Sequence, residues 1–137
     1  MTSDRRFVLD TNVIVSALLF KGSTARQAFD KALVDGELLL SVDTLYELND
    51  VLRRPKFNKY VSEEDRLQFL AALVREAAFV EVTMTITACR DPMDNKFLEL
   101  AVSGNAESII SGDDDLLSMH PFRGISIRNP RGFLEQE

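Results

Sequence analysis

The chain has 137 residues, of which 45% are apolar and 28% charged, and its formal net charge is −6. These values are typical of one soluble globular domain, and the negative charge argues against a broadly basic nucleic-acid-binding surface. No apolar run approaches the roughly 18 residues of a membrane span. The residues before Phe7 contain no signal-peptide core, so we expect a cytoplasmic protein without a membrane segment.

The first half of the chain alternates short apolar runs with helical patterns. Residues 7–9 form a strand-like run, and apolar residues recur at helical spacing from 11 to 20. Ser23 is a predicted N-cap for a helix over 24–34, which Gly36 closes. A second strand is predicted over 37–40, and the helix that follows it begins after Ser41 and stops at Pro55.

The second half continues this alternation. A capping-box-like start at Ser62 predicts a helix to about residue 78, followed by a third strand over 79–82. Asp94 opens a further helix that ends at Gly104. The last two strands are predicted over 108–110 and 125–127, with a short helix after Pro130.

Strands that alternate with helices predict a mainly parallel sheet with helices on both faces. We therefore expect residues 1–137 to form a single domain, an α/β protein with a three-layer α/β/α sandwich and a sheet of about five strands.

Cys89 is the only cysteine and His120 the only histidine. The chain therefore forms no internal disulfide and no cysteine-based zinc site. A nucleophilic cysteine normally needs a histidine partner, and His120 lies in a turn-like Ser-Met-His-Pro stretch. We interpret both residues as structural or surface residues.

Acidic residues follow two of the predicted strands. Asp10 comes directly after the first strand, and Asp113, Asp114 and Asp115 follow the fourth. Carboxylates at the carboxyl ends of parallel strands meet in the crevice where open α/β sheets bind ligands. Because clustered carboxylates repel one another and Mg²⁺ prefers oxygen ligands, this arrangement indicates a metal site.

Several acidic positions also have a structural explanation. For Asp10, a role as N-cap of the helix after it is as well supported as a role in a metal site. Asp94 is a good N-cap for the helix that ends at Gly104. Glu47, from the residues alone, is better explained as part of a solvated acidic stripe with an ion pair to Arg54. Asp91 begins an Asp-Pro turn.

Taken together, the acidic segments resemble the PIN-domain family of metal-dependent nucleases, and in particular its bacterial and archaeal VapC-type toxins. The segments that carry the resemblance are VLDTNV over 8–13, LYEL over 45–48, DPMDNKFLELA over 91–101, SGDDDLL over 111–117 and IRNPRGFL over 127–134. Their order and spacing agree with that branch over nearly the whole chain.

This resemblance implies a set of site residues. Asp10, Glu47, Asp94 and Asp113 would be catalytic and would hold Mg²⁺ or Mn²⁺, with Asp115 as a fifth ligand. Asn12 and Ser111 would orient these ligands or the attacking water. The resemblance also implies that Glu47 faces the crevice of the sheet and not the solvent.

The implied activity is hydrolysis of RNA phosphodiester bonds by metal-activated water, as the toxin of a toxin–antitoxin pair. The implied partners are an RNA substrate, an antitoxin protein and a second copy of the chain, which would form a homodimer through the helices between Thr24 and Ala78. A local basic rim would hold the RNA, although most of its candidates are more simply explained as surface charges. The candidates are Arg5, Arg6, Lys21, Arg26, Arg53, Arg54, Lys56 and Lys59.

Two other functions remain open from the sequence. One is a non-catalytic RNA- or protein-binding module on the same scaffold, because a fold does not fix a function. The other is a phosphatase with Asp10 as nucleophile, which is disfavoured because Asn12 stands where a second carboxylate would be needed.

Overall fold

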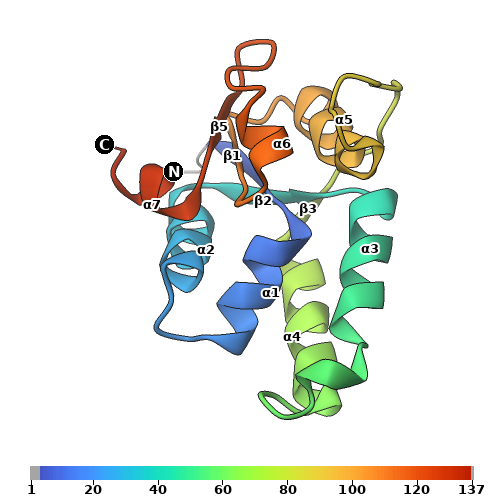
Figure 1. Ribbon diagram of the computed structural model, residues 1–137, viewed down its shortest axis with the longest axis vertical. Coiled ribbons are helices and arrows are strands. Elements are labelled where there is room, and N and C mark those ends of the chain that lie inside the picture. Colours follow the sequence, from blue (N-terminus) through green and yellow to red (C-terminus); the bar gives the residue numbers. More distant parts are fainter. Residues whose placement is uncertain (1–3, 137) are drawn as a thin grey trace.

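A five-stranded, fully parallel sheet forms the centre of the computed structural model, which describes residues 4–136 (Figure 1). The strands are β1 (Arg6–Leu9), β2 (Glu37–Leu40), β3 (Ala78–Phe79), β4 (Ser108–Ile110) and β5 (Ser126–Arg128). Their order in the sheet is β3-β2-β1-β4-β5. β1 and β4, which are distant in sequence, are therefore neighbours, with Leu9 opposite Ile110.

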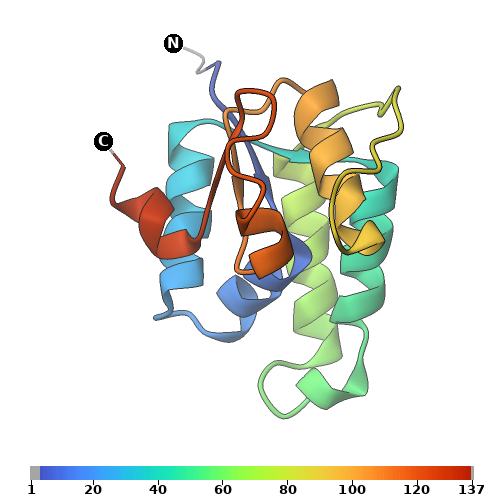
Figure 2. The same cartoon turned by 45° about the horizontal axis from the view of Figure 1, so that its top comes forward.

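Helices cover both faces of the sheet. The helices of the larger layer are α1 (Thr11–Leu19), α2 (Thr24–Asp35), α3 (Val42–Leu52), α4 (Glu63–Glu76) and α7 (Pro130–Leu134). The smaller layer contains α5 (Asn95–Ser103) and α6 (Asp114–Leu117). In Figure 1, α5 and α6 lie above the sheet and α1 to α4 below it, and in the turned view of Figure 2 the helices α5 and α6 lie in front of the sheet. The predicted three-layer α/β/α architecture is confirmed.

Alternating side chains of the strands divide the core in two. Phe7 and Leu9 of β1 pack with the larger layer, whereas Val8 packs with α5 and α6. This alternation is the two-residue period of a strand buried on both faces. Among residues 4–136, no helix combines the length and apolar character needed to cross a bilayer.

Local signals set most of the helix ends. The hydroxyls of Ser23, Ser41 and Ser62 each accept a hydrogen bond from a backbone N–H in the first turn of α2, α3 and α4. Gly36 ends α2 in extended backbone, where an added Cβ would lie 2.2 Å from the carbonyl oxygen of Arg5. This close approach lets the chain turn directly from α2 into β2.

Three elements differ from the sequence expectation. β3 covers Ala78–Phe79 instead of 79–82, and its ladder ends where Val80 N–H donates to the carbonyl oxygen of Leu40. Beyond it the side chains are mostly exposed, so nothing holds an edge strand there. β5 begins one residue late because Ile125 pairs with Phe122 in a tight turn. α6 was not predicted.

A fully buried arginine holds the connection between α3 and α4. Short 3₁₀ helix η1 (Pro55–Phe57) lies in this connection. The guanidinium of Arg66 donates to the carbonyl oxygens of Leu52 (2.6 Å), Arg54 (3.4 Å) and Val61, and to Oδ1 of Asn58 (3.0 Å). The loop over 52–61 is thus fixed from its inner side.

Candidate metal centre

The acidic residues gather at the carboxyl ends of β1 and β4. Asp10 directly follows β1, and its N–H donates to the carbonyl oxygen of Ile110 at the end of β4 (3.0 Å). Ser111 directly follows β4. Because the two strands are parallel neighbours, both residues lie at one edge of the sheet, as the sequence predicts.

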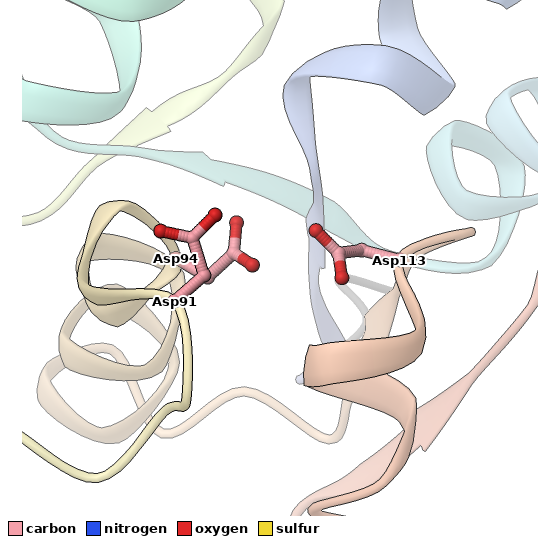
Figure 3. Close-up of side chains that lie close together, drawn as sticks. All are labelled: Asp91, Asp94 and Asp113. Carbon is pink, nitrogen blue, oxygen red and sulfur yellow. The ribbon is translucent and has the colours of Figure 1, made fainter.

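Three carboxylates form the centre of this edge. Asp91, Asp94 and Asp113 each offer an oxygen, and these oxygens lie within 4.8 Å of one another. Asp91 precedes and Asp94 ends the short 3₁₀ helix η2 (Pro92–Asp94), while Asp113 faces them from the turn between β4 and α6 (Figure 3). Figure 3 shows the three carboxylates directed toward a common space.

Asp94 shows most clearly that these carboxylates could hold a cation. It occupies the N-cap position of α5, but its side chain makes no capping hydrogen bond. Its Oδ2 is buried and has no hydrogen-bond partner among residues 4–136. Burial, followed by the hydrogen bond and negative charge of Asp113, raises the pKa of Asp94 to about 7. A divalent cation would satisfy the buried oxygen and offset the repulsion.

Ser111 joins Asp113 to Asp10. The backbone N–H of Asp113 donates to the Ser111 hydroxyl oxygen (2.9 Å), and this hydroxyl donates to Oδ2 of Asp10. Ser111 is fully buried, so its orientation is fixed. One oxygen of Asp113 also caps α6 by accepting from Asp115 N–H (2.8 Å).

Asp10 serves as a helix cap and belongs to the acidic edge at the same time. Its Oδ1 accepts from Val13 N–H (2.9 Å), which caps α1, while Oδ2 faces Ser111. Burial raises the pKa of Asp10, with the Ser111 and Val13 hydrogen bonds acting in the opposite direction. The N-cap explanation is therefore confirmed, and the role of Asp10 as a metal ligand stays a prediction.

Glu47 reaches the same edge from α3. Its Oε2 accepts from the Thr11 hydroxyl (2.6 Å), and its Oε1 lies 3.5 Å from Nζ of Lys96. The ion pair to Arg54 is made by Asp50 instead (3.5 Å). Glu47 is thus held by α1 and α5, and the solvated-stripe explanation is wrong for this residue.

The other predicted site residues occupy less central positions. The backbone groups of Asp115 place it, since its N–H donates to the capping carboxylate of Asp113 and its carbonyl oxygen accepts from the Ser118 hydroxyl (2.9 Å). The carboxylate of Asp115 is not one of the close trio. Asn12 is exposed on the first turn of α1. Asp91 was interpreted only as a turn residue, a role it does have because it accepts from Met93 N–H (3.0 Å). Its spacing of three residues from Asp94 was the signal for a shared site.

Comparison with known proteins identifies the family. The sequence model of the PIN domain matches residues 6–115. The chain belongs to the PIN-domain family. This match confirms the resemblance found in the sequence and supports a nuclease in general. The protein MJ1680 of Methanocaldococcus jannaschii is similar in sequence, with 33% identity over 119 residues that cover 83% of this chain and 74% of the relative.

Solved structures share the fold. A chain of VapBC2 from Rickettsia felis, bound to a DNA fragment from its promoter, superposes with a TM-score of 0.61 and 13% identity, covering 90% of this chain and 98% of that one. A chain of DNA-bound VapBC from Salmonella typhimurium gives a TM-score of 0.61 and 16% identity, covering 92% and 98%. At these identities the likeness concerns the fold, and it agrees with the VapC-type resemblance of the sequence.

Proposed function

We propose that this PIN protein is a divalent-metal-dependent endoribonuclease that hydrolyses RNA phosphodiester bonds with water as the nucleophile. The observation that carries the proposal is the unpartnered, buried Oδ2 of Asp94 beside the carboxylates of Asp91 and Asp113. A group of oxygens with this charge suits Mg²⁺ or Mn²⁺. When bound, such an ion lowers the pKa of a water molecule and polarises the phosphoryl group.

The residues of the chain divide the remaining work. Asp94 and Asp113 would hold the ion with Asp10, and Asp91 adds a carboxylate that the sequence did not assign. Ser111 keeps Asp10 and Asp113 in a fixed relation through its two hydrogen bonds. Glu47, held by Thr11 and Lys96, would add a further carboxylate to the ligands of the ion.

Water is the nucleophile in this proposal because the two other candidates have structural roles. Cys89 is buried, which raises the pKa of its thiol, and its Sγ contacts the carbonyl oxygen of Asp115 (3.6 Å). Nδ1 of His120 accepts from Ile127 N–H (2.9 Å) and so supports β5. Both residues match the structural interpretation made from the sequence.

The proposed biological role is the toxin of a toxin–antitoxin pair in the cytoplasm, with an antitoxin protein as partner. This role is supported by the fold shared with chains of VapBC complexes. We further propose a homodimer through α3 and α4. Between these helices lies a hollow of about 610 Å³ whose walls include Leu45, Leu70 and Val74, and the neighbouring Val42 and Tyr46 are each more than 70% exposed.

A cleavage assay tests the catalytic part of the proposal. The purified chain should cut RNA in Mn²⁺ or Mg²⁺ and lose this activity in a chelator. Asp10→Asn and Asp94→Asn should abolish cleavage with the fold intact, whereas Asp50→Asn, at the exposed partner of Arg54, should cleave normally. Retained metal-dependent cleavage in both site variants would exclude the assignment.

Calorimetry separates the nuclease from its main rival, a non-catalytic RNA- or protein-binding module. We expect heat of Mn²⁺ binding from the wild-type chain and none from Asp94→Asn. No binding at millimolar metal would favour the rival.

A further inference from the structure

A groove leads away from the acidic edge along α1. Its volume is about 400 Å³, and one wall is α1 while the other is the loop containing η1. The groove begins at Asn12, two residues after Asp10, and reaches Phe20 at the end of α1. At 1.5 Å per residue, the eight steps from Asn12 to Phe20 span about 12 Å, and the Asn12 end of the groove lies two residues along the chain from Asp10.

Two aromatic rings are exposed at the far end of this groove. Phe20 and Tyr60 contact each other edge to face, with ring centroids 5.5 Å apart, and they are 47% and 51% exposed. Nucleobases stack on such rings, and stacking tolerates any base because every base has a π-face. The pair is therefore a suitable platform for a base.

Two lysines lie beside the rings. The Nζ atoms of Lys56 and Lys59 each lie 5.2 Å from an aromatic centroid, those of Phe57 and Tyr60. Within residues 4–136, neither lysine forms an ion pair with a carboxylate. Of the six other rim candidates, five are engaged with side-chain partners. These five are Arg5, Arg6, Arg26, Arg53 and Arg54. Lys56 and Lys59 are thus available to bind phosphates.

The loop that presents these side chains is held in place by the buried Arg66. Its guanidinium binds the carbonyl oxygens of Leu52 and Val61, which flank the loop, and Oδ1 of Asn58 inside it. A fixed loop binds a flexible strand at a lower entropic cost than a mobile one.

We propose that the groove between Asn12 and the Phe20–Tyr60 pair binds the single-stranded RNA flanking the cleaved bond, with a base stacked on the pair and phosphates on Lys56 and Lys59. This inference rests on the proposed nuclease function and adds the place where its substrate is held. An aromatic platform with adjacent cations matches single-stranded RNA, whose unstacked bases are free to stack on protein rings.

The absence of tryptophan from the sequence allows a direct test. Tyr60→Trp places a single fluorescent indole on the platform, and Phe79→Trp places one at equal exposure (51%) on the edge strand β3. Short oligouridylate is added in Ca²⁺, and its integrity is checked afterwards. We expect saturable quenching of the indole in Tyr60→Trp and none in Phe79→Trp. Absent quenching, or equal quenching in both variants, would overturn the groove assignment.

Affinity measurements extend the test. Tyr60→Ala should weaken oligouridylate binding about tenfold, the effect of losing one base stack. Lys56→Ala and Lys59→Ala should each lower the slope of log affinity against log salt by about 0.7, whereas Arg75→Ala on the last turn of α4 should leave it unchanged. Equal slopes in all three variants would contradict the phosphate contacts.

Parallel cleavage by the wild-type chain separates this inference from the proposed function. Cleavage without quenching in Tyr60→Trp would overturn the groove and keep the nuclease. Quenching without cleavage would keep the RNA groove and overturn the nuclease.

Discussion

Replacing Asp94 by asparagine should stabilise the metal-free protein at neutral pH. The pKa of Asp94 is about 7 in the folded chain against 3.8 for an ordinary aspartate, so between these values the folded chain holds a proton that the unfolded chain lacks. The stability of the wild-type protein therefore falls as pH rises from about 4 to 7. Asp94→Asn lacks this slope, and its amide is able to donate to the neighbouring Asp113.

The magnitude follows from the pH interval. Between pH 5 and pH 7, two pH units at about 1.4 kcal/mol each give an upper bound of about 3 kcal/mol. Because Asp94 is only partly buried, solvent screening reduces this to about 1.5 kcal/mol. The stability advantage of Asp94→Asn over the wild type should grow by about this amount between pH 5 and pH 8.

Urea denaturation in chelator at the two pH values measures the difference. Asp50→Asn is the matched control, since its carboxylate is 75% exposed and paired with Arg54, and its advantage should not grow with pH. An Asp94→Asn variant whose relative stability is the same at pH 5 and pH 8 would refute the argument that carboxylate repulsion is stored in the metal-free site.

Three further substitutions test the supports of the site. Ser111→Ala should lower the rate of cleavage about 10- to 100-fold in saturating Mn²⁺, because Asp10 and Asp113 lose the hydroxyl between them. A rate within twofold of wild type would contradict this role. Thr11→Val should weaken Mn²⁺ binding about tenfold in calorimetry by freeing Glu47, and Thr11→Ser should restore it; equal affinities in both variants would argue against the role of the hydroxyl. Arg66→Met should lower the free energy of unfolding, measured in urea, by about 3 kcal/mol, because it leaves buried carbonyl oxygens without donors. A loss below about 1 kcal/mol would show that the loop does not need this side chain.

The sequence predicted the fold well because its signals are local. Each buried strand is a short apolar run, and serines or glycines mark the ends of most helices. β3 was misplaced because an edge strand of two residues depends on its neighbour, Leu40, rather than on its own pattern. α6 was missed because four residues are too few to show a helical period of apolar side chains. The only local signal for this helix is its N-cap, Asp113.

The candidate site was only partly predictable, since its members lie far apart in sequence. The residues after β1 and β4 were found from their position at strand ends, whereas the position of Glu47 depends on contacts with Thr11 and Lys96 across three helices. Asp91 was assigned a single role, that of a turn residue, which hid its place beside Asp94. The support from Arg66 had no signal at all, because a buried arginine that binds only carbonyl and amide oxygens reads as an ordinary surface charge.

The pairing of β1 with β4 has a consequence for synthesis of the protein. Asp10 leaves the ribosome about 100 residues ahead of its partners Ser111 and Asp113. In the proposed nuclease, a growing polypeptide therefore carries an incomplete set of carboxylates until the residues that follow β4 have been added.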